Sequence, residues 1–202
     1  MYIRELIRQN FGNIPTAQQT EVFALLEKFL DSVNPDECFI LKGYAGTGKT
    51  TLISALVKVL PKLKLKSVLL APTGRAAKVI SNYSGRKAFT IHKKIYRKKV
   101  AASPEMNFVL GDNIMDNTIF IVDEASMISD QVHDYSRQSL LQDLISFVYN
   151  GKNCKLMLVG DTAQLLPVGS AISPALNKQF VSDQFQLNVL TYELTDVVRQ
   201  EK

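Results

Sequence analysis

The sequence predicts an α/β protein in which helices cover both faces of a parallel sheet. Helical patterns and short apolar runs alternate along the 202 residues, as in chains built from strand–helix–strand units. The apolar runs are rich in Val, Ile and Leu without alternating polar residues, which is typical of strands buried on both faces. One run leads through a glycine-rich stretch, GYAGTGKTT, into a helical pattern. We therefore expect one domain, residues 1–202, with about five parallel strands.

The first clear helical pattern covers residues 16–30, with Thr16 as a suitable N-cap. Apolar residues recur in it at i, i+3, i+4 and i+7, so one helix face is buried. They are Val22, Leu25, Leu26 and Phe29. Further helices are expected after Lys49, after Thr73, near residues 90–96 and over residues 139–150, where Gly151 stops the pattern. The predicted strands are residues 38–41, 67–71, 118–122, 155–159 and about 189–194.

Residues 98–117 interrupt this alternation. They contain Ala, Ser, Pro, Gly and Asn without a clear period. We expect a short loop or small hairpin inserted into the domain.

Composition indicates a globular, cytoplasmic protein without a membrane segment. Hydrophobic residues make up 46% of the chain and charged residues 21%. No apolar run approaches the roughly 20 residues that span a bilayer, and the N-terminus is amphipathic rather than signal-like. Cys38 and Cys154 are too isolated for a disulfide framework or a metal cluster. We expect both to be reduced and structural.

Basic residues are concentrated in one part of the chain. Residues 38–104 hold 15 of the 24 Lys and Arg residues and none of the 19 Asp and Glu residues. This asymmetry indicates a polyanionic partner, and a nucleic-acid backbone would use more of these cations than ATP would. The cluster at residues 86–99 is the favoured contact, whereas the lysines at residues 58–66 also fit a solvated surface.

Residues 43–50 match the phosphate-binding loop G-x-x-x-x-G-K-[ST] of P-loop NTPases. Its glycines allow a tight turn in which the backbone N–H groups point inward. The turn lies beside a helix N-terminus, whose dipole favours anions. Lys49 would reach the β- and γ-phosphates of ATP, and the Thr50 hydroxyl would hold Mg²⁺. A glycine-rich turn that binds nothing is the alternative. The predicted ATP contacts in this loop are Gly43, Ala45, Gly46, Thr47, Gly48, Lys49, Thr50 and Thr51.

Two further polar groups follow predicted strands. In TIFIVDEASMI, Asp123 is placed to bind Mg²⁺ and Glu124 to orient or deprotonate the attacking water. An ordinary acidic turn is the alternative. In KLMLVGDTAQLLPVGSA, the cluster Gly160, Asp161 and Gln164 follows a strand, and the neutral amide of Gln164 is a candidate γ-phosphate sensor.

Together and in this order, these blocks resemble the first motor domain of superfamily 1 DNA helicases, most closely the RecD-like group, superfamily 1B. GYAGTGKTT, LLAPTGRAAK, TIHKKIY, IFIVDEASMI and LVGDTAQLLPVG are similar to its motifs I, Ia, Ib, II and III. The resemblance implies a RecA-like fold, ATP hydrolysis and translocation along single-stranded DNA, with 5′→3′ polarity.

The resemblance also assigns residues outside the phosphate loop. PTAQQTEVF is similar to the motif whose Gln reads adenine, which implies Gln19 or, by a shift of one residue, Gln18. LTDVVRQ is similar to motif IV, which implies that Arg199 contacts the γ-phosphate. Residues 98–117 occupy the place of a strand-separating pin, but the segment is short. The implied DNA contacts are Pro72, Thr73, Arg75, Thr90 and His92.

Superfamily 1 motors bind ATP between two RecA-like domains, and no second motor domain is found in these 202 residues. We expect the partner domain to belong to the same longer polypeptide. The chain by itself is expected to bind Mg·ATP and to hydrolyse it slowly without unwinding duplex DNA. Two other interpretations stay open, another P-loop ATPase and a non-catalytic DNA-binding subunit.

Overall fold

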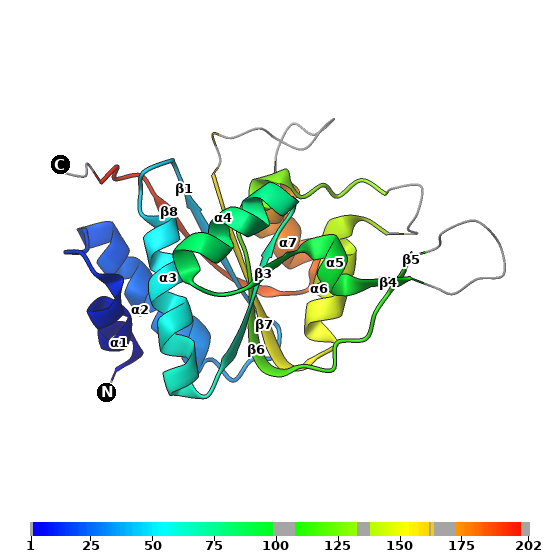
Figure 1. The fold of residues 1–202 in the computed structure, drawn as a ribbon, viewed down its shortest axis with the longest axis horizontal. Coiled ribbons are helices and arrows are strands. Elements are labelled where there is room, and N and C mark those ends of the chain that lie inside the picture. Colours follow the sequence, from blue (N-terminus) through cyan, green and yellow to red (C-terminus); the bar gives the residue numbers. More distant parts are fainter. Residues whose placement is uncertain (1, 99–107, 133–137, 162, 164–172, 199–202) are drawn as a thin grey trace.

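Six parallel strands form the central sheet of the computed structural model, which describes residues 2–98, 108–132, 138–161, 163 and 173–198. The strand order is β3-β2-β6-β7-β1-β8 (Figure 1). In chain order the helices are α1 (Ile3–Phe11), α2 (Ala17–Asp31), α3 (Lys49–Val59), α4 (Gly74–Ser84), α5 (Ile91–Ile95), α6 (Leu140–Tyr149) and α7 (Lys178–Phe185). The strands are β1 (Glu37–Gly43), β2 (Lys66–Ala71), β3 (Ala88–Thr90), β4 (Tyr96–Lys98), β5 (Phe108–Leu110), β6 (Asp116–Val122), β7 (Lys152–Gly160) and β8 (Asn188–Leu194).

Helices cover both faces of this sheet, as predicted. Phe39 and Leu41 of β1 belong to the core under α1, α2, α3 and α4. Cys38 and Ile40 belong to the opposite core, which α5, α6 and α7 cover (Figure 1). Successive side chains of a strand point to opposite faces, so a strand buried on both faces must be apolar throughout. This explains the non-alternating apolar runs of the sequence.

All five predicted strands are present, and the sheet has a sixth, β3, at the edge beside β2. The prediction of about five strands missed β3 because it is only three residues long and all three are half-buried. A short edge strand carries no apolar run that a pattern could detect. The helix expected near residues 90–96 is shorter than predicted, since Tyr96 already belongs to β4.

β4 and β5 pair antiparallel outside the main sheet. In Figure 1 they project away from the sheet on the side of α5. Within the segment expected as an inserted loop or hairpin, residues 108–110 form β5, and Asp116 and Asn117 already belong to β6.

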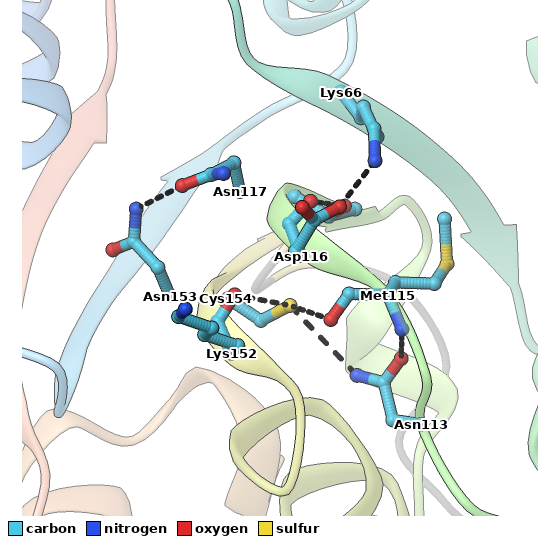
Figure 2. A network of polar contacts seen from close by, with 9 residues as sticks. Lys66, Asn113, Met115, Asp116, Asn117, Lys152, Asn153 and Cys154 are labelled. Atoms are coloured by element: carbon cyan, nitrogen blue, oxygen red, sulfur yellow. Dashed lines mark hydrogen bonds and ion pairs between the residues drawn. The ribbon is translucent and has the colours of Figure 1, made fainter.

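A polar network connects neighbouring strands at their amino ends (Figure 2). Lys66 at the start of β2 forms an ion pair with Asp116 at the start of β6. The Asn153 amide donates to Asn117 Oδ1 at 2.6 Å, which joins β7 to β6. Because all six strands are parallel, every carboxyl end lies at the other edge, where the sequence places its phosphate loop and carboxylates.

Among the described residues, none of the helices combines the length and the apolar character needed to cross a membrane.

Candidate functional site

The phosphate loop connects the carboxyl end of β1 to the first turn of α3. Gly46 and Gly48 have φ angles of 81° and 91°, which residues with a Cβ rarely adopt. The chain therefore turns from the strand into the helix within a few residues. This places the unpaired N–H groups of the α3 N-terminus beside the loop, as an anion-binding site requires.

Three glycines of this loop lie against distant parts of the chain. A Cβ at Gly43 would stand 2.9 Å from the Leu194 carbonyl oxygen, and one at Gly46 would stand 3.3 Å from Val197 Cγ1. A Cβ at Gly48 would stand 2.5 Å from the Gln19 amide nitrogen. In addition, the Val198 N–H donates to the Gly46 carbonyl at 2.9 Å. The loop is thus packed between α2 and the segment after β8.

Gln19 connects the start of α2 to this loop. Its Oε1 accepts from the Thr16 N–H at 3.0 Å, while the Gln19 N–H donates to Thr16 Oγ1 at 3.2 Å, so the two residues form a capping box. Its Nε2 donates to the Thr47 carbonyl at 3.0 Å, and only 2% of the residue is exposed. Adenine recognition by Gln19 stays a prediction, and in this structure its amide supports the loop.

Gln18 has a different set of partners. Its Nε2 donates to Thr195 Oγ1 at 2.7 Å. Its Oε1 accepts from the N–H groups of Thr195 and Asp196 at 2.8 and 3.0 Å. The two neighbouring glutamines of α2 therefore have different tasks, since Gln19 binds the loop itself and Gln18 binds the chain after β8.

Lys49 folds back onto the loop that precedes it. Its Nζ donates to the carbonyl oxygens of Gly43 at 2.6 Å and Tyr44 at 2.8 Å. Burial lowers the pKa of Lys49, and the negative charges of Asp161, Asp123 and Glu124, in that order, oppose this decrease. Carboxylates that follow two neighbouring strands therefore act electrostatically on the ammonium group.

The strand geometry of β6 ends between the two acidic residues that follow it. The Asp123 N–H still donates to the Leu70 carbonyl at 3.0 Å, but Glu124 adopts the left-handed conformation with φ 56°. For a residue with a side chain this conformation costs on the order of 1 kcal/mol. A continuing strand would send the two carboxylates to opposite faces of the sheet, whereas here the strand ends between them.

Tyr83 is a site residue that the sequence did not indicate. It lies in the last turn of α4, and its hydroxyl donates to Asp123 Oδ2 at 2.5 Å. Burial and then the charge of Asp123 raise the pKa of Tyr83 well above its usual value, while a hydrogen bond with the Thr50 side chain acts in the opposite direction. Its phenol therefore lies beside both predicted Mg²⁺ ligands.

Asp161 is the second residue without a predicted role, although its polar cluster was recognised. It follows β7, is 4% exposed, and accepts the Ala163 N–H at 2.8 Å. Of the three carboxylates that oppose the decrease in the Lys49 pKa, Asp161 has the largest effect. An aspartate directly after an apolar strand was the available signal, the same that identified Asp123.

The oxygen donors at this edge fit Mg²⁺. Thr50 offers a hydroxyl and Asp123 a carboxylate, and the Tyr83 phenol donates to the Asp123 carboxylate. Mg²⁺ prefers oxygen ligands and is usually held by one or two carboxylates together with substrate phosphates. Within the described part of the chain no group of three or more His, Cys, Asp and Glu residues forms a metal cage. The two oxygen donors suit a metal that also takes phosphate oxygens as ligands.

Two predicted catalytic residues, Gln164 and Arg199, lie outside the described residues. Their roles stay predictions.

The predicted DNA contacts come together at the carboxyl ends of β2 and β3, which are paired strands. Thr73 caps α4 by accepting the Ala76 N–H at 3.2 Å, and Thr90 caps α5 by accepting the Lys93 N–H at 3.3 Å. Both hydroxyls thus also stabilise helix N-termini. The other members of the predicted set lie beside these caps, with Pro72 half-buried and Arg75 and His92 exposed.

The aromatic residues near these caps are only half-buried. Lys87 and Lys94 lie over the Phe89 ring, with Nζ at 5.2 and 5.9 Å from its centroid. The ring centroids of His92 and Tyr96 are 5.6 Å apart. The surface over β3 and α5 therefore combines cations with aromatic rings, as a single-stranded nucleic acid site does.

A family model described as an AAA domain matches residues 17–202. The ATP-dependent RecD2 DNA helicase of Deinococcus radiodurans is 32% identical over 144 residues, which cover 71% of this chain and 18% of that protein. The ATP-dependent DNA helicase Dda of Enterobacteria phage T4 is 31% identical over 163 residues, which cover 79% of this chain and 34% of that protein. The chain therefore spans only a minor part of these curated relatives.

Among solved structures, Bacteroides sp Pif1 in complex with ADP-AlF4 aligns with 94% of this chain and 44% of its own chain, with a TM-score of 0.57 and 20% identity. At this identity the likeness concerns the fold alone. It confirms the predicted α/β P-loop NTPase fold of the RecA-like type.

Proposed function

Because this chain belongs to the AAA domain family and is a motor domain of the RecD-like superfamily 1B type, we propose that it binds and hydrolyses Mg·ATP and couples hydrolysis to 5′→3′ movement along single-stranded DNA. One observation carries the proposal. Lys49, at the N-terminus of α3, folds onto the phosphate loop at the Gly43 and Tyr44 carbonyls, and the charges of Asp161, Asp123 and Glu124, which follow the adjacent strands β7 and β6, act on its ammonium group. A lysine in the phosphate loop, an aspartate for the metal and a second group for the attacking water are parts that phosphoryl transfer uses.

Nucleotide binding changes the partners of Lys49. Its ammonium group exchanges the carbonyls of Gly43 and Tyr44 for β- and γ-phosphate oxygens. The exchange is favourable because phosphate oxygens carry negative charge, so the ammonium group gains an ion pair in place of bonds to neutral carbonyls. The backbone N–H groups at the start of α3 bind further phosphate oxygens.

Thr50 and Asp123 would hold Mg²⁺, which neutralises charge that develops on the phosphates. Glu124 accepts the proton of the attacking water. Its left-handed backbone ends the strand directly after Asp123, so the two carboxylates can take separate tasks at the same end of β6. Gln164 and Arg199 act at the γ-phosphate in this proposal, as their motifs imply.

Single-stranded DNA is proposed to cross the caps of α4 and α5, where Thr73, Arg75, Thr90 and His92 lie. A second motor domain of the same polypeptide completes the ATP cleft in this proposal. DNA helicase activity belongs to that whole protein, in the cytoplasm. The present chain alone is expected to hydrolyse ATP slowly and not to unwind duplex DNA.

The ATPase rate with and without single-stranded DNA tests the proposal. Lys49→Ala should weaken ADP binding about 10- to 100-fold, since it removes charge-assisted bonds. Glu124→Gln should keep ADP binding and lower turnover about 100- to 10,000-fold, the range of general-base catalysis. Lys58→Ala, an exposed lysine in the last turn of α3, is the matched control and should change neither.

The outcomes separate the open alternatives. Stimulation by DNA supports a motor domain, whereas turnover without stimulation supports another P-loop ATPase. DNA binding without nucleotide binding supports a non-catalytic subunit. Full turnover of Glu124→Gln would show that Glu124 is not the general base. Robust strand displacement by the 202-residue chain would contradict the expected dependence on a second domain.

A further inference from the structure

Tyr83 is held in place by its backbone as well as by its side chain. Its carbonyl oxygen accepts the Ser54 hydroxyl of α3 at 3.3 Å, which fastens the last turn of α4 to α3. Its ring packs against the core between the sheet and α3. Since Thr50 lies in the first turn of α3, Tyr83 bridges the helix that carries one predicted metal ligand and the strand end that carries the other.

Among the residues that the structure describes, each oxygen of the Asp123 carboxylate has one hydrogen-bond donor. Oδ1 accepts the Glu124 N–H at 3.0 Å and Oδ2 accepts the Tyr83 hydroxyl at 2.5 Å. An ionised carboxylate offers about four lone-pair sites, so each oxygen can accept one further bond. The two donors therefore fix the rotation of the carboxylate and leave a free position on each oxygen for a metal or a metal-bound water.

We propose that Tyr83 is a positioning residue for the Mg²⁺ site, in which the phenol hydroxyl holds the Asp123 carboxylate toward Thr50 before the metal arrives. This inference rests on the proposed function. Without the hydroxyl, Oδ2 loses its donor and the carboxylate must be ordered when Mg²⁺ binds. Groups that hydrogen-bond to a metal ligand commonly change metal affinity by about 10- to 100-fold when they are removed.

The geometry favours positioning over competition between the phenol and the metal. Competition would require the hydroxyl to leave Oδ2 as Mg²⁺ binds, yet Tyr83 is anchored at its carbonyl and its ring. The free lone pair on Oδ2 also makes such a departure unnecessary. The two possibilities predict opposite signs, because removal of a competing hydroxyl would strengthen metal binding.

Tyr83→Phe separates them, since it removes only the hydroxyl. ADP binding is measured first in EDTA and then at a fixed ADP concentration while Mg²⁺ is titrated. The Mg²⁺ concentration at half-maximal enhancement of ADP binding should rise about 5- to 10-fold in Tyr83→Phe, near the lower end of the range for such groups. ADP affinity in EDTA should stay within about 2-fold of the parent protein, because no phosphate contact is removed.

Tyr192→Phe is the matched control. The Tyr192 hydroxyl also donates to a carboxylate, Glu21 Oε2 at 2.6 Å, but this pair joins β8 to α2. Its Mg²⁺ midpoint should equal that of the parent protein. An equal or lower midpoint for Tyr83→Phe overturns the inference alone, as does a loss of ADP binding in EDTA. A parent protein without Mg²⁺-dependent ADP binding overturns the proposed function and this inference with it.

Discussion

Gly48→Ala is expected to test how the phosphate loop is held in place. Gly48 has a φ angle of 91°, and a Cβ there would stand 2.5 Å from Gln19 Nε2. The Gln19 amide cannot simply rotate away, because it is buried and bonded at both ends, to Thr16 and Thr47. An added methyl group must therefore strain the backbone and displace this amide.

The size of the effect follows from these two terms. An alanine in the left-handed conformation costs about 1 kcal/mol. Displacement of the amide breaks the bond to the Thr47 carbonyl, which is worth about 1 kcal/mol, and disturbs the packing around it. The expected loss of unfolding free energy is about 2–3 kcal/mol, which lowers Tm by about 5–10 °C in a protein of this length.

Gly12→Ala provides the matched control. Gly12 ends α1 with a φ angle of 82°, and nothing lies within 4 Å of a Cβ placed there. Only the backbone term applies, so Tm should fall by about 2–4 °C. Thermal unfolding followed by circular dichroism gives both values.

A double-mutant cycle completes the test. In a Gln19→Ala background the cost of Gly48→Ala should fall to that of Gly12→Ala, since the clashing amide is gone. Equal Tm decreases for the two single glycine variants, or a cycle without coupling, would refute the reasoning.

Two further predictions concern the start of α2 and the cysteines. Thr16→Ala should cost about 1 kcal/mol, or about 2–4 °C in Tm, because it removes the cap of the Gln19 N–H. Thr20→Ala, whose hydroxyl adds a second bond to the Thr16 carbonyl, should change unfolding free energy by less than about 0.5 kcal/mol in the same denaturation assay. Burial raises the pKa of Cys38 from 9.0 to about 12, so the folded protein should not react with a thiol reagent at Cys38 at pH 8, whereas the unfolded protein should. Because the folded-state pKa is the higher one, the stability that this thiol contributes is complete below pH 9.0 and is lost as the pH rises toward 12. Rapid labelling of Cys38 in the folded protein would contradict the burial of this side chain.

The strands were predictable because burial on both faces leaves a continuous apolar run, as in β1 and β7. The edge strand β3 has three half-buried residues, so no such pattern existed. Asp123 and Glu124 could be located because they follow β6 directly. For these elements the signal is local in the sequence.

Contacts between distant residues were not predictable in this way. Tyr83 and Asp123 are 40 positions apart and meet only because α4 packs beside α3 on one face of the sheet. One signal was available and unused, since Thr16-x-x-Gln19 is the pattern of a capping box. It would have assigned Gln19 a structural partner and separated it from Gln18, which has no such relation to Thr16.

The packing of the phosphate loop has a consequence for protein design. The nine residues GYAGTGKTT, from Gly43 to Thr51, look like a portable cassette. Yet the space above each of three glycines is filled by a side chain or carbonyl from another part of the chain, at Gln19, Leu194 and Val197. A graft of these nine residues between the strand and helix of another scaffold would transfer the sequence of the loop without the residues that pack against it. To transplant the loop, a designer must also transplant the beginning of α2 and the segment that follows β8.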